Sequence, residues 1–570
     1  MNQRFQQRFP LGFESRLLSV DSRKVPLFRF DVLVVGSGAA GSAAALAAAA
    51  SGAEVALLTK ETPQETNTLY AQGGVAAVLG ADDSVASHVQ DTLDVGCGLS
   101  NREVVEAVIG AGRASIKRLL QWGAKLDREP DGSLTLSREG GHSHPRIVHA
   151  HGDSTGREIQ ATVVRALEEH PRITLFPKVF ALDLLQDQDG TVIGLLASDE
   201  RGRSLVFSGG RTILATGGSG QLYRETTNPS IATGDGVAMG FRAGAVVRDL
   251  EFFQFHPTLL YIAGAARVLI SEIVRGHGGL LRDRDGVRFM PEAHPKAELA
   301  PRDVVSRAVF RRMVETRDTN VYLDLSQLDG DPHKLFPGIA KVCHFFGIDI
   351  AKDPVPVRPG AHYQVGGLEV DIDGRTTLRG LSAVGECAST GLHGANRMGS
   401  NSLLEGLVLG TRAGERAAQD ATDRGLSDFE VRPPRVLAPA PGGIQVNISD
   451  VVYSLKSLMW RQMGVERDAT SMRDALDKIS LWTRAVEALA PSNPRTWELL
   501  NMLLMSQLAT IGALAREESR GVHWRSDFPS AKAGPAQHTR LIPEVDGPQL
   551  VAVGLEHVDV RQAQAETAQQ

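Results

Sequence analysis

The sequence predicts an α/β fold with more than one domain, and three observations support this prediction. Residues 31–36 read as a short apolar strand, which is followed by a glycine-rich turn, an alanine-rich helix and a second strand at residues 54–59. Residues 251–365 are more aromatic and rich in arginine and histidine, which indicates an inserted domain. Leucine, methionine and tryptophan recur at helical spacing over residues 446–526. We therefore expect a Rossmann-like dinucleotide-binding domain, an inserted second domain and a C-terminal helical domain.

The turn after the first strand has the spacing of the dinucleotide-binding fingerprint, in the run Gly36-Ser37-Gly38-Ala39-Ala40-Gly41. Gly36 makes the tight turn, Gly38 lets the backbone approach a pyrophosphate, and Gly41 lets the helix pack closely on the strand. The helix N-terminus then faces the phosphate charge. An ordinary glycine-rich turn has the same glycines, but the flanking strands and helix favour a dinucleotide site.

The end of the second strand departs from the usual dinucleotide pattern. That pattern places an acidic residue there to hold the ribose hydroxyl, but Lys60 stands at this point and Glu61 follows. Lys60 therefore replaces the usual carboxylate, or Glu61 does its job one residue later. A little further on, Gly73-Gly74 suggests a second close approach of backbone to the cofactor.

The elements that follow are predicted from periodicity. Residues 84–126 have apolar positions at helical spacing, and residues 152–170 read as a helix opened by Ser154 or Thr155. Strands are expected near residues 173–176 and 192–197. Residues 211–218 form an apolar run that stops at a Thr-Gly-Gly turn, as expected where a central strand delivers backbone to a ligand.

Composition limits the classes of function. A net charge of −6 without a basic stripe argues against nucleic-acid binding. The three cysteines are far apart in the chain, which argues against a disulfide framework or a metal site and favours the cytoplasm: Cys97, Cys343 and Cys387. No run approaches the roughly 20 apolar residues of a membrane span, so we expect no direct membrane insertion.

Composition also sets the expected domain boundaries. Residues 1–29 carry six basic side chains and two acidic ones, and they lack the apolar core of a secretory signal. The last 25 or so residues are polar. We expect tails at residues 1–29 and 546–570, the dinucleotide-binding domain at 30–250 and 366–430, the inserted domain at 251–365, and the helical domain at 431–545.

Several polar residues are candidates for a site, although each has an ordinary alternative. Asp235 opens a helix, either as an N-cap or as a ligand group. Glu139 lies in a loop dense in ionisable side chains, which composition alone favours as a solvated loop. Any single histidine or arginine of the inserted domain is more often a surface or core residue than a catalyst. Only the convergence of these side chains would mark a site.

Together the motifs, from Asp31 to about Pro529, resemble the flavoprotein family that contains succinate dehydrogenase, fumarate reductase and L-aspartate oxidase. The resemblance implies a FAD-binding domain that is split by a mobile α+β capping domain and followed by a helical C-terminal domain. It implies FAD contacts at Gly36, Ser37, Gly38, Ala39, Ala40, Gly41, Lys60, Asn67, Thr68, Leu69, Tyr70, Ala71, Gln72, Gly73, Gly74, Asp235, Glu386, Ser402 and Leu403.

Two positions distinguish members of this family. Succinate dehydrogenases and fumarate reductases usually attach FAD to a histidine in a His-Thr-x-x-Ala-Gln-Gly-Gly run, but this sequence has Asn67 at that position. An amide cannot form the bond, so FAD should be non-covalent, as it also is in soluble fumarate reductases. Glu139 looks like the L-aspartate oxidase form of its loop, and a carboxylate there would pair with the ammonium group that aspartate has and succinate lacks.

The resemblance therefore implies FAD-dependent oxidation of L-aspartate to iminoaspartate by hydride transfer from Cα to flavin. Oxygen or fumarate would reoxidise the flavin, and the product would feed quinolinate and NAD synthesis, with quinolinate synthase as a candidate partner. Arg302 would be the proton shuttle, although a free guanidinium is effectively always protonated. The substrate carboxylates would be held by Arg397, His362, His256 and Thr258, with Ser271 and Glu272.

Two alternatives stay open from the sequence. One is a soluble fumarate reductase or the flavoprotein subunit of a succinate dehydrogenase, against which Asn67 and Glu139 count. The other is a non-catalytic FAD-binding scaffold, which would have no need of a dicarboxylate clamp.

Overall fold

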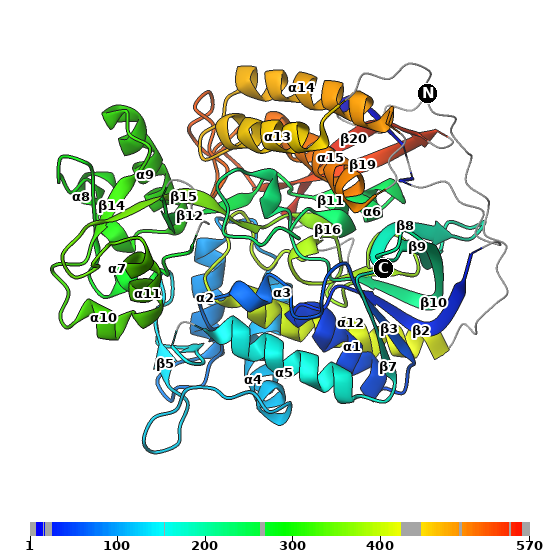
Figure 1. Cartoon of the computed structure of the whole chain (residues 1–570), viewed down its shortest axis with the longest axis horizontal. Coiled ribbons are helices and arrows are strands. Elements are labelled where there is room, and N and C mark those ends of the chain that lie inside the picture. The colour runs from blue at the N-terminus through cyan, green and yellow to red at the C-terminus, as the bar shows by residue number, and fades with distance from the viewer. Residues whose placement is uncertain are drawn as a thin grey trace.

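The structure is a computed structural model that describes residues 7–14, 16–17, 25–152, 154–262, 268–422, 446–489, 493–546 and 549–560. Its elements confirm the α/β fold class. In Figure 1 the inserted region, in green, forms the left end of the molecule, and the C-terminal helices, in yellow and orange, cross the top.

The central sheet contains the predicted unit of strand, glycine turn, helix and strand. Its strands are β2 (Leu27–Val35), β3 (Val55–Thr59), β7 (Ile173–Pro177), β8 (Phe180–Gln186), β9 (Val192–Ser198), β10 (Ser204–Leu214) and β17 (Leu381–Ala383). Their order is β7-β3-β2-β10-β9-β8, and β17 also pairs with β10. Strands β7, β3, β2, β10 and β17 run parallel, so their carboxyl ends share one edge, where open α/β sheets bind ligands.

Helices cover the central sheet and a small three-stranded sheet beside it. The helices are α1 (Ala39–Ala50), α2 (Val85–Val95), α3 (Arg102–Gly110), α4 (Gly112–Gln121), α5 (Thr155–Glu169), α6 (Asp235–Arg242) and α12 (Asn401–Thr422). Three of these, α2, α3 and α4, lie in the region that was predicted to be helical, at residues 84–126. The small sheet has the order β4-β6-β5 and contains β4 (Val75–Ala76), β5 (Leu136–Ser137) and β6 (Ile147–Val148).

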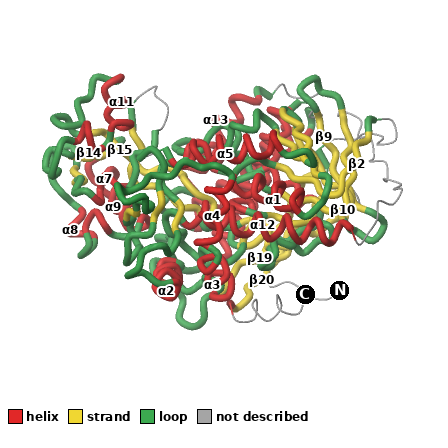
Figure 2. The backbone as a smooth tube through the Cα atoms, turned by 90° about the horizontal axis from the view of Figure 1, so that it is seen from below, coloured by secondary structure: helices red, strands yellow, loops and turns green. Residues whose placement is uncertain are grey.

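Helices α1 and α12 pack closely because both present small residues at their contact. Alanine fills most of α1, and glycine recurs every four residues on α12. A Cβ at Gly410 would lie 2.3 Å from the carbonyl oxygen of Ala40, and a Cβ at Gly414 would lie 2.1 Å from that of Ala44. The two backbones therefore approach more closely than larger side chains allow. Figure 2 shows α12 and α5 beside α1.

The inserted region has a sheet and a hydrophobic core of its own. Its antiparallel strands have the order β12-β15-β14-β13, and helices pack around them. Because β12 and β15 pair with each other, the two connections to the central domain lie side by side. The elements are β12 (Phe253–Leu260), α7 (Ile273–Gly276), β13 (Leu280–Arg282), α8 (Met290–Ala293), α9 (Arg302–Thr316), β14 (Val321–Asp324), α10 (Pro332–Leu335), α11 (Pro337–Phe345) and β15 (Val355–Gln364).

The two ends of the chain pair in one sheet, which corrects the expectation of loose tails at residues 1–29 and 546–570. The order is β1-β20-β19-β11-β16-β18. Buried Phe13 and Val553 belong to the main hydrophobic core. Strand β1 pairs with β20, from the other end of the chain, and β20 also forms a hairpin with β19, so the composition of either end alone does not reveal the sheet. They are β1 (Gln7–Glu14), β11 (Val247–Arg248), β16 (Gly367–Glu369), β18 (Ala388–Ser389), β19 (Gln537–Asp546) and β20 (Gln549–Asp559).

The C-terminal helices are α13 (Ile448–Gln462), α14 (Ala469–Glu487) and α15 (Pro494–Ala515). They do not fill the range predicted for the helical domain, because residues 537–545 belong to β19 and the boundary at residue 430 lies outside the described residues. By length and composition α15 could cross a membrane, which corrects the expectation that no such run exists. However, 83% of its apolar window is buried inside the structure, where it forms the core of the helical region.

The inserted region contacts the C-terminal region through arginines of α9. The Arg311 Nε atom lies 2.6 Å from the Glu466 carboxylate, and Arg307 donates to the backbone oxygen of Gly521 at 3.3 Å.

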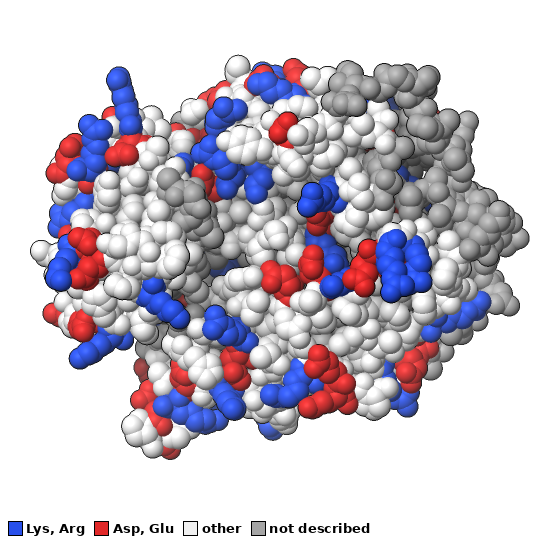
Figure 3. All heavy atoms as spheres, in the orientation of Figure 1, with Lys and Arg blue, Asp and Glu red and all other residues white. Residues whose placement is uncertain are grey.

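Figure 3 shows that acidic and basic side chains are interspersed over the face of the molecule that Figure 1 presents. The net charge of −6 is therefore not gathered into one patch on that face.

Candidate active site

A cavity of about 800 Å³ runs from the glycine turn to the inserted region. It brings together most of the residues predicted for a site, from the central domain at one end and from the inserted region at the other. Three predicted residues do not line it. They are Gly41, Leu69 and Thr258, and the Thr258 hydroxyl donates to the backbone oxygen of Ile270 at 2.9 Å.

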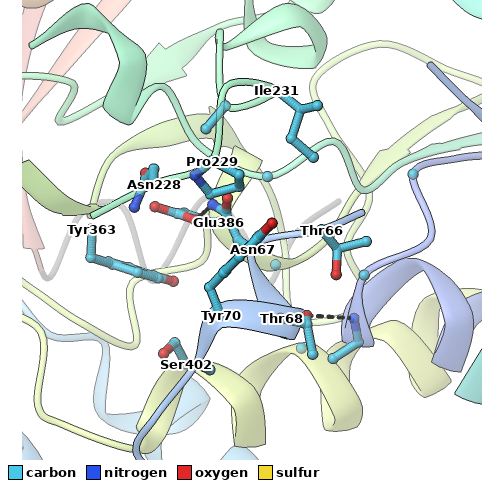
Figure 4. Close-up of a pocket in the computed structure, with 18 of the residues that line it drawn as sticks. Thr66, Asn67, Thr68, Tyr70, Asn228, Pro229, Ile231, Tyr363, Glu386 and Ser402 are labelled. Atoms are coloured by element: carbon cyan, nitrogen blue, oxygen red, sulfur yellow. Dashed lines mark hydrogen bonds between the residues drawn. The ribbon is translucent and has the colours of Figure 1, made fainter. Parts of the chain in front are cut away.

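The glycine turn has the close contacts that its spacing predicts. Gly36 has a φ of 108°, and a Cβ on it would lie 2.2 Å from the carbonyl oxygen of Ala215. A Cβ on Gly41 would lie 1.9 Å from the Gly36 oxygen, so this glycine allows α1 to pack on the strand. The Ala39 amide at the start of α1 binds the Thr68 hydroxyl at 3.0 Å (Figure 4).

Lys60 lies in a half-buried cluster of polar side chains that connects the central domain with α15. Its Nζ atom lies 2.7 Å from Asp235 Oδ2 and 2.6 Å from Glu498 Oε1, and it also donates to the Thr233 hydroxyl at 2.7 Å. Burial lowers the pKa of Lys60, but the two carboxylates outweigh it and raise the pKa above its ordinary value. Lys60 is therefore a fixed positive charge at the cavity wall.

The wall around Asn67 has polar atoms without partners. Asn67, which lies beside Glu386 in Figure 4, donates to Glu386 Oε2 at 3.0 Å. Its own Oδ1 atom is buried without a hydrogen-bond partner, as is Gln72 Oε1. Glu386 also accepts from the Gln364 amide at 2.9 Å, and burial raises its pKa. Because unpaired buried polar atoms are costly, these groups fit a polar ligand in the cavity. With the glycine turn they fit a dinucleotide cofactor such as FAD.

Arg397 is buried at the wall between the two ends of the cavity. Its Nη2 atom donates to the Ser402 hydroxyl, its guanidinium lies 5.0 Å from the ring centre of Tyr363, and its Nε atom has no hydrogen-bond partner. Burial and the charge of Arg302 lower the pKa of Arg397 to about 10. It therefore stays charged at neutral pH with a donor free for an anionic ligand.

Arg302, at the start of α9, is fixed by two side chains. Its Nε donates to Glu272 Oε2 at 2.6 Å, and its Nη1 donates to Gln254 Oε1 at 3.3 Å. On its other side, Glu272 lies 3.8 Å from buried Arg275. Burial raises the pKa of Glu272, but the two guanidinium groups bring it down to about 2. Glu272 is therefore a carboxylate held between two cations.

The rings of His256 and His362 pack edge to face, with their centres 5.3 Å apart. Burial, assisted by the charge of Arg302, lowers the pKa of both well below the ordinary value, so both imidazoles are neutral at pH 7. His256 Nδ1 accepts from the backbone amide of Thr258 at 3.3 Å, which leaves the proton on Nε2. A neutral imidazole in this form can donate to a carboxylate.

Glu139 is buried in the wall opposite Arg302. Its Oε2 atom accepts from the Ser400 hydroxyl at 2.8 Å. A Cβ on Gly399 would lie 2.6 Å from the same oxygen and 3.1 Å from Arg302 Nη2. The missing side chain at Gly399 therefore lets a carboxylate and a guanidinium face the same small space.

Sequence reasoning missed four of these residues: Gln254, Tyr363, Ser400 and Glu498. Each acts through a partner from a distant part of the chain, such as Arg302 for Gln254 and Lys60 for Glu498. The sequence signals were slight. Tyr363 adjoins the predicted His362, and Gln254 lies two residues before the predicted His256. Glu498 is the one acidic residue of the apolar helix α15, which is the local signal that could have found it.

Comparison with known proteins agrees with this geometry. Residues 31–403 match the model of the FAD binding domain, and residues 453–569 match that of the fumarate reductase flavoprotein C-terminus. A chain of E. coli quinol fumarate reductase superposes with a TM-score of 0.87 at 33% identity, covering 94% of this chain and 97% of that one. The protein is therefore a FAD-binding flavoprotein of the fumarate reductase class.

Two relatives show to which family of this class the chain belongs. L-aspartate oxidase of Streptomyces coelicolor is 42% identical, over 87% of this chain and 88% of the relative. The chloroplastic L-aspartate oxidase 2-b of Nicotiana tabacum is 41% identical, over 90% of this chain and 83% of the relative. The chain belongs to the L-aspartate oxidase family.

Proposed function

We propose that this protein oxidises L-aspartate to iminoaspartate at the inserted-region end of the cavity. The observation that carries the proposal is Glu139, a buried carboxylate that shares a small space with Arg302. Aspartate has two carboxylates and one ammonium, so it needs cationic and anionic partners in the same pocket. A buried ammonium without such a partner would cost several kcal/mol.

The substrate carboxylates bind to Arg397, Arg302 and the two imidazoles. Arg397 has an unpaired donor, and neutral His256 adds an N–H without adding charge. Ser271 and Glu272 line the same wall, and Glu272 orients Arg302 through their 2.6 Å bond. Thr258 has an indirect part, because its hydroxyl holds the backbone oxygen of Ile270 next to Ser271. This arrangement fixes Cα before reaction, which is where binding energy accelerates a transfer.

The cofactor is FAD, and we propose that it is held without a covalent bond. It would be held by residues that line the cavity: Gly36 to Ala40, Lys60, Asn67, Thr68, Tyr70 to Gly74, Asp235, Glu386, Ser402 and Leu403. When bound, FAD supplies the two-electron acceptor for the hydride that leaves Cα. The start of α1 supplies positive charge for its phosphates, whereas the charge of Lys60 is neutralised by Asp235 and Glu498.

Arg302 has one role in aspartate oxidation and another in fumarate reduction. In aspartate oxidation its guanidinium neutralises a substrate carboxylate. In fumarate reduction the same group, fixed by Glu272 and Gln254, is placed to give a proton to the substrate. Arg275 lies beyond Glu272, so a proton given up by Arg302 can be replaced from that side.

A second function, fumarate reduction, is supported by the dicarboxylate clamp itself. Guanidinium groups and neutral imidazoles can bind the carboxylates of a ligand whether or not it has an amino group. The clamp consists of such groups only: Arg302, Arg397, His256 and His362. We therefore propose that fumarate as well as oxygen can accept the electrons. We also propose that the product feeds quinolinate and NAD synthesis, with quinolinate synthase as a candidate partner. A cytoplasmic location is in keeping with three free thiols, although the tobacco relative is chloroplastic.

Glu139→Gln tests the main proposal. It keeps the size of the side chain and removes its charge, so kcat/KM for L-aspartate should fall by roughly a hundredfold, the effect expected for loss of a buried ion pair. Fumarate reduction by the same variant should fall much less, because fumarate has no ammonium. Both rates are measured on the holoenzyme, with flavin content as the control. Equal losses in the two reactions would contradict the ammonium role.

A further inference from the structure

The carboxylate of Glu139 depends on one hydroxyl for its orientation. Among the described residues, Ser400 is the only hydrogen-bond donor to it, at 2.8 Å from Oε2. The other oxygen, Oε1, points past Gly73, where a Cβ would lie only 3.1 Å away. Glu139 is therefore confined by a glycine on one side and held by a hydroxyl on the other.

Ser400 is held in a conformation that side chains avoid. Its φ is +62°, in the left-handed region that favours glycine, and the residue is buried. Glycine would relieve the backbone strain at this position, but it would lose the hydroxyl that lies 2.8 Å from Glu139. The hydroxyl that this conformation presents is the one that binds Glu139.

The turn that carries Ser400 is anchored to the loop that carries Glu139. His142, three residues after Glu139, lies 3.0 Å through Nε2 from the backbone oxygen of Gly399. Because a carbonyl only accepts, Nε2 carries the proton, and Nδ1 is left to accept from Arg146 Nη1 at 3.4 Å. Both neighbours of the ring therefore specify the same neutral tautomer.

Arg146 fixes the far end of this loop on α2. It is fully buried, binds both oxygens of Asp83 at 2.9 and 2.8 Å, and binds Asp91 at 2.6 Å. Asp91 also accepts from the Ser143 amide at 2.8 Å. Bidentate pairing gives directional rigidity as well as energy. The loop from Glu139 to Arg146 is therefore fastened to α2 at one end and to the 399–400 turn through His142.

We infer that Ser400 is a specificity-determining positioning residue, which aims the Glu139 carboxylate at the substrate ammonium, and that His142 holds the Ser400 turn in place. This inference rests on the proposed function, since it assumes that Glu139 pairs with the ammonium. Ser400 acts through Glu139 and makes no step of the reaction itself. Its effect falls on the choice between an amino dicarboxylate and a plain dicarboxylate.

The test compares Ser400→Ala, Ser400→Gly and Ser400→Thr in the holoenzyme. The readout is the ratio of kcat/KM for L-aspartate oxidation to kcat/KM for fumarate reduction. Alanine and glycine both remove the hydroxyl and should lower the ratio roughly tenfold, mainly through KM for aspartate, as expected for one lost charge-assisted hydrogen bond. Threonine keeps the hydroxyl, so its ratio should fall less than that of alanine, even where the strain of a β-branched residue at this φ lowers its stability. If alanine and glycine leave the ratio unchanged, the inference is wrong.

A double-mutant cycle separates this inference from the proposed function. Ser400→Ala should add little to the loss already caused by Glu139→Gln, because the hydroxyl then has no carboxylate to aim. Fully additive losses would overturn the inference while leaving the proposed function standing. If Glu139→Gln alone leaves the ratio unchanged, the ammonium role fails and this inference fails with it. His142→Gln, which keeps a donor near the position of Nε2, should preserve the ratio better than His142→Leu.

Discussion

Asn67 is the residue on which the proposal of non-covalent FAD depends. Its amide lies beside Glu386 in the cofactor part of the cavity, and an amide cannot form the bond that a histidine makes to the flavin. Acid precipitation of the holoenzyme should therefore leave the flavin in the supernatant, at about one FAD for each chain. The measurement is the absorbance of the supernatant and of the redissolved pellet. Unfolding in urea followed by desalting gives an independent check, and yellow colour that stays with the protein contradicts the proposal.

At the same scale, the chemistry of the site was predictable from sequence and its orientation was not. Residue types such as Arg302, Glu139 and Asn67 carry their chemistry wherever they stand in the chain. The partners that aim them, such as Gln254 and Ser400, are ordinary polar residues whose role exists only after distant segments meet. A hydrogen bond between residues 139 and 400 leaves no trace in either segment.

At the scale of elements, the contact of α1 with α12 positions the glycine turn. A methyl group at Gly410 would lie 2.3 Å from the Ala40 backbone oxygen, which cannot move without moving α1. Gly410→Ala should therefore destabilise the protein by about 1–3 kcal/mol, as overpacking does, and should weaken FAD binding because α1 begins at the cofactor turn. Thermal unfolding and flavin titration of the apoprotein measure the two effects. Gly110→Ala is the matched control, since nothing lies within 4 Å of its added methyl.

If Gly410→Ala and Gly110→Ala have equal stability, the close contact between α1 and α12 does not contribute to the stability of the protein.

Among the elements, as among the residues, those with a local signal were predictable from the sequence and those that depend on distant partners were not. The unit formed by β2, α1 and β3 was predictable because its signal is local and strongly periodic. Strand β1 was not, because its partner in the sheet is β20, from the opposite end of the chain. Strand β20 also pairs with its neighbour β19, but the polar composition of the last residues hid this hairpin.

Across the whole molecule, buried neutral histidines make stability depend on pH. Burial is the main cause that lowers each pKa, to about 4 in His88 and about 3 in His142, and well below the ordinary value in His256, His362 and His523. In the unfolded chain these imidazoles titrate near pH 6.5. Below that pH the unfolded state binds more protons than the folded state, so the free energy of unfolding falls as the pH falls.

The contribution of these histidines to the free energy of unfolding of the holoenzyme should therefore be fully present above about pH 7. It should decline from pH 6.5 downward, before carboxylates protonate near pH 4. Linkage gives a loss of about 2 kcal/mol for each such histidine between pH 7 and pH 5. Urea unfolding at the two pH values, followed by tryptophan fluorescence, measures the change. His142→Gln removes one contributor, so its loss over the same interval should be smaller by about 2 kcal/mol. A wild-type midpoint that stays constant from pH 7 to pH 5 would show that these imidazoles are not held neutral by the fold.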